Sequence, residues 1–188
     1  MINVSKVFND RPKVFKTDLE KEVYDTLDKL KIEYNRVVTD EAITMEDCVN
    51  IKNALETEIV KTLFLCNQKK TKFYLYVTKS NRRFDTKIFC KKLGISRVSF
   101  ASEELLMEKM KVNIGATSVF CLLNDKKNAT SFVIDKDILK MPYYGCSDTT
   151  TTGYMKIKME DLYKFLKYVN HEIYIIDVED VWKIEEIL

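Results

Sequence analysis

EIVKTLFLCNQKKTKFYLYV, residues 58–77, decides the fold of this chain, because it predicts two adjacent strands joined by a polar turn. Strand-forming residues fill 59–65 and the return run 73–77, and NQKK at 67–70 supplies the connection. One lysine, Lys61, lies inside the first apolar run. An ammonium among such neighbours loses hydration, so it needs a partner, a wet cleft or an anionic ligand. The alternative is that Lys61 extends its ammonium from a strand end to solvent.

Predicted helices and strands alternate on both sides of this hairpin. Helices are expected to follow the capping residues Thr17 (with Glu20), Thr44 (with Asp47), Asp85 and Ser102, and to cover 159–169 and a short tail at 181–188. Strands are expected at 33–38, 97–100, 118–123, 130–134 and 172–178, the third and fourth joined as a hairpin, and the threonines at 149–152 are expected to be extended. This order favours an α/β (α+β mixed) fold with a central mixed, mostly antiparallel sheet flanked by helices.

Length and charge narrow the classes of function. The 188 residues can bury one core, so a single domain over 1–188 is expected. The 31 basic and 29 acidic residues give a net charge of +2, so there is no overall positive field for nucleic acid, and any RNA contact must be local. The basic clusters that could make it are Lys69-Lys70-Lys72, Arg82-Arg83-Lys87 and Lys91-Lys92, each of which could equally be a solvated surface.

Cysteine and histidine usage gives little support to a metal site or a Cys-His nucleophile. The five cysteines are scattered without a Cys-x-x-Cys pair, and His171 is the one histidine, so no metal or cofactor is expected. Cys146 is the one thiol that falls among the site residues considered below. No apolar run approaches the roughly 20 residues that cross a bilayer, so we expect a cytoplasmic protein without a membrane partner.

Several segments, taken in order, resemble one known family. They are VYDTLDKLKIEYNRVVTDEAITMEDC (23–48), IVKTLFL (59–65), RRFDTKIFCKKLGISRVSFASEELLMEKMKV (82–112), NIGATSVFCLLND (113–125) and FVIDKDIL (132–139). Together they resemble the YbaK/ProX superfamily of aminoacyl-tRNA editing domains, and most closely its free-standing ProX/PrdX branch. The resemblance runs from about residue 19 to about 165, which leaves 1–16 as an additional leader and 170–188 as an additional tail.

The resemblance implies hydrolysis of a mischarged aminoacyl-tRNA, typically alanyl-tRNA(Pro), without a metal. The charged 3′ end of tRNA is then the expected partner, prolyl-tRNA synthetase a further one, and DNA none. The family's conserved lysine falls on Lys61. Its other site elements fall on the rim residue Thr44, which could equally be a plain helix cap, on the loop Gly115, Ala116, Thr117 and Ser118, and on YYGCSDTTTT (143–152).

The chain departs from the family pattern at that third element and beside the glycine. Tyr144 stands where the family usually has histidine, with Tyr143 at that place if the register shifts by one, and Ile114 and Val119 stand where proline is common. A tyrosine with a pKa of about 10 is a poor base near neutral pH. These departures leave open a second reading, a non-catalytic aminoacyl-tRNA or amino-acid sensor with the same fold.

The expected chemistry needs no side-chain nucleophile, because an aminoacyl ester is already activated and a positioned water suffices. Lys61 is expected at the terminal phosphate or ester oxygens, and the backbone N–H groups of 115–117 at the carbonyl. Asp148 is expected to bind the substrate ammonium and Thr149, or a neighbouring hydroxyl, to orient the water. Lys61, Gly115 and Asp148 must then meet around one crevice.

Overall fold

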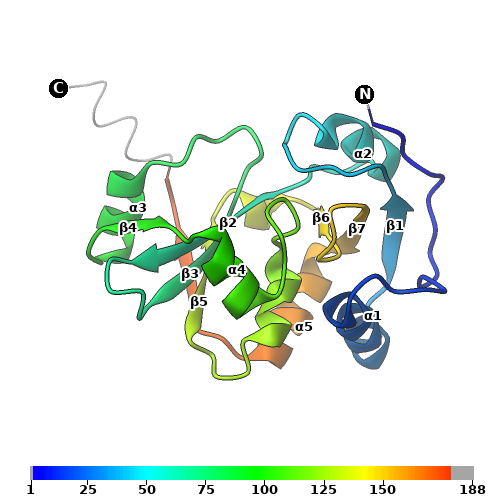
Figure 1. Ribbon diagram of the computed structural model, residues 1–188. Helices are drawn as coiled ribbons and strands as arrows, with labels where there is room; N and C mark the ends of the chain where they lie inside the picture. Colours follow the sequence, from blue (N-terminus) through cyan, green and yellow to red (C-terminus); the bar gives the residue numbers. More distant parts are fainter. Residues whose placement is uncertain (1, 179–188) are drawn as a thin grey trace.

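The computed structural model describes residues 2–178 and forms two β-sheets with helices packed around them (Figure 1). The predicted tail helix at 181–188 lies outside the described residues. None of the helices in the described part of the chain is both long enough and apolar enough to span a bilayer.

The predicted hairpin forms the centre of the larger sheet. Its strands β2 (Lys61–Asn67) and β3 (Phe73–Thr78) pair antiparallel, with Lys61 opposite Thr78. The sheet has the order β4-β2-β3-β5-β8, and the other members are β4 (Val98–Phe100), β5 (Thr130–Asp135) and β8 (Ile173–Ile176). Because β3–β5 and β5–β8 pair in parallel, helices must carry the chain from one end of the sheet to the other between these strands.

A second, smaller sheet has the order β1-β7-β6 and is antiparallel throughout. Its strands are β1 (Tyr34–Val38), β6 (Tyr143–Ser147) and β7 (Gly153–Lys158). It meets the segment before β2 where the Val60 N–H donates to the Gly145 carbonyl over 2.9 Å. A Cβ on Gly145 would lie 2.5 Å from the Glu58 carbonyl oxygen, so the junction needs glycine. The prediction of a mixed, mostly antiparallel architecture is confirmed, but the strands form two sheets rather than one.

Four of the predicted helices form at the expected places, three of them after the predicted capping residues. They are α1 (Asp18–Leu30), α3 (Thr86–Leu93), α4 (Glu103–Met110) and α5 (Met159–Val169). The Thr17, Asp85 and Ser102 side chains accept N–H bonds at the starts of α1, α3 and α4. Gly94 ends α3 with φ +64°.

The helix α2 (Cys48–Leu55) begins three residues after the predicted start at Met45. The Asp47 carboxylate accepts hydrogen bonds from the Thr44 N–H (3.0 Å) and the Thr44 hydroxyl (2.9 Å). The predicted Thr44–Asp47 pair therefore forms, but it closes a separate turn, and the helix starts only after Asp47.

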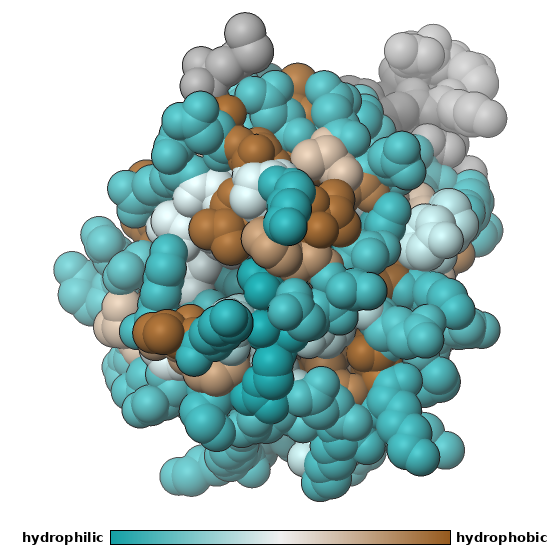
Figure 2. All heavy atoms as spheres, turned by 90° about the vertical axis from the view of Figure 1, so that its right-hand side faces the viewer, coloured by the Kyte–Doolittle hydropathy of each residue, from teal (hydrophilic) through white to brown (hydrophobic). Residues whose placement is uncertain are grey.

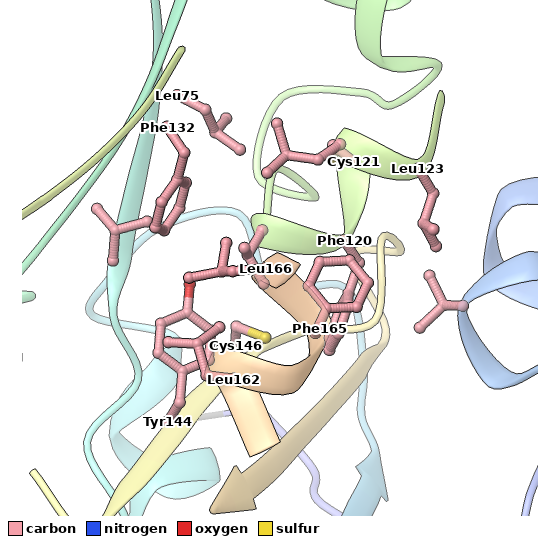
Figure 3. Packing of buried hydrophobic residues seen from close by; sticks show 14 of the residues in the cluster. Leu75, Phe120, Cys121, Leu123, Phe132, Tyr144, Cys146, Leu162, Phe165 and Leu166 are labelled. Atoms are coloured by element: carbon pink, nitrogen blue, oxygen red, sulfur yellow. The ribbon is translucent and has the colours of Figure 1, made fainter. Parts of the chain in front are cut away.

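The predicted strand 118–123 and its hairpin are wrong. The run VFCLL is instead part of a buried 3₁₀ helix, η1 (Val119–Asn124), and β5 pairs with β3 rather than with this segment. A continuous apolar run has no period, so it does not distinguish a buried strand from a buried helix. The Phe120 ring of η1 packs edge-on against Phe165 of α5 at 5.0 Å between centroids, inside the main core (Figure 3).

The leader follows β1 as an extended segment, with bridges from Val4 to Thr39 and from Phe8 to Arg36. Phe8 is half-buried, whereas Val7 is 44% and Val14 83% exposed. The face on this side of the molecule is mostly hydrophilic, and its largest group of hydrophobic residues lies in the upper half of the view (Figure 2). The leader therefore extends the edge of the smaller sheet, and its partly buried side chains Ile2, Val4 and Phe15 pack against the hydrophobic clusters.

Candidate functional site

A cavity of about 280 Å³ lies where the loop before α2, the start of β2, the glycine loop after α4 and the end of β6 come together. Four of the predicted site residues line it: Thr44, Lys61, Gly115 and Thr117. The rest of its wall is mainly apolar, formed by residues that include Ile43, Met45, Cys48, Ile59, Leu63, Ile114 and Tyr154. We call this cavity the Lys61 pocket.

Lys61 is the first residue of β2, and its side chain is half-buried. Its ammonium donates a hydrogen bond to the Arg82 carbonyl oxygen. Among residues 2–178 it makes no salt bridge, and burial lowers its pKa, while the charge of Glu46 acts in the opposite direction. The pocket therefore holds a partly dehydrated cation that an anionic or strongly polar ligand would stabilise.

The glycine loop has the backbone geometry that its sequence predicts. Gly115 has φ +89°, and a Cβ there would lie 2.9 Å from the Ile43 Cα, so this loop presses directly against the loop before α2. The Ala116 N–H donates to the Asn113 carbonyl over 3.1 Å. Within the described residues the N–H groups of Gly115 and Thr117 have no acceptor, which leaves two backbone donors at the pocket.

Sequence reasoning missed two polar residues that line the pocket, Thr62 and Ser147. The Ser147 hydroxyl donates to the Ala116 carbonyl over 2.9 Å and so ties β6 to the glycine loop. The Thr62 hydroxyl is buried without a hydrogen-bond partner in the described part of the chain. The alternation of side chains along Tyr143–Ser147 was the available signal, because it sets Ser147 on the opposite face from Tyr144.

Tyr144 lies in the core instead of the pocket. Its side chain is fully buried and packs with Cys146, Leu162 and Leu166 (Figure 3). Burial raises the pKa of both the Tyr144 hydroxyl and the Cys146 thiol well above their usual values. In this register the Tyr144 side chain lies in the core and is not among the residues that line the Lys61 pocket, so the structure does not place it where a substrate contact was expected. Tyr143, the alternative, lies at the far end of β6 and lines a different cavity.

Asp148 is also placed away from the pocket lining. It is 3% exposed and accepts hydrogen bonds from the Tyr24 hydroxyl (3.0 Å) and the Thr150 hydroxyl (2.7 Å). Its carboxylate lies over Gly153, where a Cβ would approach it to 2.1 Å. Burial raises the pKa of Asp148 to about 6. The carboxylate is enclosed in the connection between β6 and β7, so the structure does not place Asp148 where a contact with a substrate ammonium was expected.

The remaining predicted residues are enclosed as well. Thr149 is buried with φ +81°, so the predicted extended threonine run is wrong, and residues 148–152 form a compact connection instead. The side chains of Ala116 and Ser118 are 2% and 0% exposed, which leaves their backbone as the part near the pocket. Lys61 and Gly115 thus meet around one crevice as expected, without Asp148.

The architecture and the pocket define a class of protein: a mixed α/β domain with a small, mainly apolar cavity that carries one lysine and open backbone donors. The family model for the aminoacyl-tRNA editing domain matches residues 39–165, which include the whole Lys61 pocket. The chain therefore belongs to the aminoacyl-tRNA editing domain family.

Known proteins of similar sequence agree with this assignment. The chain is 32% identical to the prolyl-tRNA editing protein ProX of Acetoanaerobium sticklandii over 150 residues, 80% of this chain and 92% of that protein. It is 28% identical to the prolyl-tRNA synthetase associated domain-containing protein 1 of Danio rerio over 156 residues, 82% of this chain and 84% of that protein.

A solved structure has the same fold. The crystal structure of a candidate trans-editing enzyme for prolyl tRNA synthetase superposes with a TM-score of 0.63 at 16% identity, over 87% of this chain and 98% of that one. At this identity the likeness shows the fold alone.

Proposed function

We propose that this protein is a trans-editing deacylase that hydrolyses the ester between the ribose of a tRNA 3′ end and a wrongly attached amino acid. The observation that carries the proposal is the meeting of the Lys61 ammonium with the open N–H groups of Gly115 and Thr117 at one small pocket. The membership of the editing family and the 32% identity to a prolyl-tRNA editing protein support it. Alanyl-tRNA(Pro) is the proposed substrate, and prolyl-tRNA synthetase is the enzyme whose errors would be cleared.

The reaction adds water across the ester bond. Water attacks the carbonyl carbon, the bond from that carbon to the ribose oxygen breaks, and the ribose oxygen takes a proton, so free amino acid and uncharged tRNA leave. The Gly115 and Thr117 N–H groups would stabilise the negative charge that develops on the carbonyl oxygen. Lys61 would hold the ester oxygens or the terminal phosphate, and the ligand would restore the contacts that burial takes from its ammonium.

A pocket hydroxyl would position the water. Ser147 is the group we assign, because its hydroxyl already donates to the Ala116 carbonyl and its oxygen can still accept a hydrogen bond. This replaces the role expected of Thr149. Held close to the ester carbon, the water reacts as if at a very high local concentration.

The substrate ammonium needs a negative group, and Asp148 is enclosed. We assign the binding of the substrate ammonium to Glu46, an exposed residue beside the pocket wall whose charge already acts on Lys61. The cavity of about 280 Å³ is at the small end of ligand pockets and favours a small side chain such as that of alanine. Discrimination would come from exclusion of larger side chains, because one methylene is worth only about 1–3 kcal/mol.

The test is release of free amino acid from alanyl-, cysteinyl- and seryl-tRNA by the full chain and by Lys61→Ala. Lys127→Ala is the matched control, because Lys127 is an exposed lysine outside the pocket. We expect turnover of alanyl-tRNA(Pro) that Lys61→Ala lowers at least 10-fold and Lys127→Ala leaves unchanged. Binding of charged tRNA without turnover across the panel would favour the second reading, a non-catalytic sensor.

A further inference from the structure

A second concave surface lies beside α3, outside the Lys61 pocket. It encloses about 830 Å³ and is lined by residues that include Arg83, Phe84, Lys87 and Arg97. We call it the α3 groove. Two residues of the basic cluster Arg82-Arg83-Lys87, Arg83 and Lys87, line this groove, and the fold adds Arg97 from the segment that leads into β4.

The groove carries a local excess of positive charge. Arg83, Lys87 and Arg97 are exposed, and in the described chain none of the three forms a salt bridge. The one carboxylate in the lining is Asp85, which accepts hydrogen bonds from the Lys87 and Ile88 N–H groups at the start of α3. With a net charge of only +2 for the whole chain, three uncompensated cations in one groove favour a polyanion.

Aromatic rings lie at the same place. Phe100 of the edge strand β4 is 60% exposed, and its ring packs edge-on against Phe84 with 5.4 Å between centroids. A large exposed aromatic ring next to a basic groove is the combination that binds single-stranded nucleic acid, in which phosphates face cations and bases stack on rings. Neither feature alone would distinguish a nucleotide strand from another anion.

The α3 groove is connected to the Lys61 pocket through the segment between β3 and α3, seen as an arch in Figure 1. The Lys61 ammonium binds the carbonyl oxygen of Arg82, and the next residue, Arg83, lines the groove. Consecutive Cα atoms are about 3.8 Å apart, so the groove begins within one residue of the backbone that holds Lys61. A strand whose end occupies the pocket can therefore continue into the groove.

We propose that the α3 groove binds the unpaired nucleotides that precede the charged 3′ end of the RNA. Phosphates face Arg83, Lys87 and Arg97, and a base stacks on the exposed face of Phe100. The inference rests on the proposed function, because it places the end of that strand in the Lys61 pocket. The groove also gives the preceding nucleotides a binding surface, because the Lys61 pocket of about 280 Å³ has room for the aminoacyl group and leaves those nucleotides outside.

The experiment compares two triple variants of the full chain. One removes Arg83, Lys87 and Arg97 as alanines, and the control removes three exposed lysines on other surfaces, Lys13, Lys127 and Lys167. Fluorescence anisotropy measures binding of a labelled single-stranded RNA dodecamer that ends in CCA, at several salt concentrations. For the groove variant we expect at least 10-fold weaker binding and a salt slope reduced by about 2, since each phosphate contact on a single strand contributes about 0.7. Phe100→Ala should weaken binding about 5- to 140-fold with the salt slope unchanged.

Kinetics separate this inference from the proposed function. The groove variant should lose at least 10-fold in kcat/KM on charged tRNA and keep its kcat/KM on alanyl-adenosine, which lacks the preceding nucleotides. Equal RNA affinity and salt slope for the two triple variants would overturn the groove assignment even if charged tRNA is hydrolysed. Loss of RNA binding by the groove variant alone would support the groove even if no charged tRNA is hydrolysed, in which case the proposed function fails by itself.

Discussion

Replacement of Gly115 by alanine tests the contact between the two loops that form the Lys61 pocket. At φ +89° an alanine is strained by about 1–2 kcal/mol. Its Cβ would also lie 2.9 Å from the Ile43 Cα, so one loop must move by about 0.5 Å to reach ordinary contact at 3.4 Å. Such a shift costs about 1–3 kcal/mol. The two costs together predict a loss of about 2–5 kcal/mol of unfolding free energy, which lowers Tm by roughly 4–20 °C for a chain of this size.

Gly94→Ala is a matched control, because Gly94 also has a positive φ of +64° but a Cβ there would have no atom within 4 Å. It should cost about 1–2 kcal/mol, the strain alone. Thermal unfolding followed by circular dichroism gives both values, and deacylation of alanyl-tRNA(Pro) well below either Tm gives the rates.

The two substitutions should differ in activity more than in stability. Because the Gly115 and Thr117 N–H groups are the proposed donors to the carbonyl oxygen, a shift of this loop should lower kcat/KM at least 10-fold, whereas Gly94→Ala should leave it unchanged. Equal changes in Tm for the two variants would contradict the described approach to Ile43. A wild-type rate for Gly115→Ala would contradict the role of the loop.

Three further substitutions test the buried residues around the site. Tyr144→Phe removes a buried hydroxyl that has no hydrogen-bond partner among the described residues, so the free energy of unfolding should be unchanged or rise by up to about 1 kcal/mol. The deacylation rate should stay within twofold of the wild-type rate. A 10-fold slower rate would show that Tyr144 contacts the substrate. Gly145→Ala should lower Tm, measured by calorimetry, by more than 10 °C, because the added Cβ would lie 2.5 Å from the Glu58 carbonyl oxygen where the two sheets meet. An unchanged Tm would refute the close approach of Gly145 to Glu58. Asp148 has a folded pKa of about 6, above its ordinary 3.8, so its favourable contribution is complete below about pH 4 and is lost as pH rises through 6. Relative to Asp148→Asn, the wild type should lose up to ~3 kcal/mol of unfolding free energy between pH 4 and 7 in urea titrations, and a constant difference would show that the carboxyl is not enclosed.

Local sequence signals predicted most of the fold. The hairpin of β2 and β3 and the caps at Thr17, Asp85 and Ser102 depend on neighbouring residues only, and all of them are confirmed. The 3₁₀ helix η1 was missed because five consecutive apolar residues carry no period, and only its packing beneath the sheet decides its conformation. The division into two sheets was missed for a similar reason, because it depends on which distant strands pair.

The sequence predicted the lysine and the glycine loop of the site better than the segment 143–152. A lysine within an apolar strand and a glycine before small residues identified Lys61 and Gly115 correctly as neighbours of one pocket. Around Tyr144 and Asp148 the family pattern identified the segment that reaches the site but not which of its side chains face the pocket. A shift of one residue along a strand moves a side chain from the core side to the pocket side. Ser147, three residues after Tyr144, is the side chain that this element presents to the pocket.

A complex with a stable substrate analogue tests most directly whether the Lys61 pocket holds the acyl group. The ligand is an alanyl-adenosine in which an amide replaces the ester, and the measurement is its crystal structure bound to the full chain. We predict that its carbonyl oxygen lies about 3 Å from the N–H of Gly115 or Thr117, with the Lys61 ammonium turned toward the ribose. An alanyl group bound outside this pocket, with Lys61 still on the Arg82 carbonyl, would contradict the account.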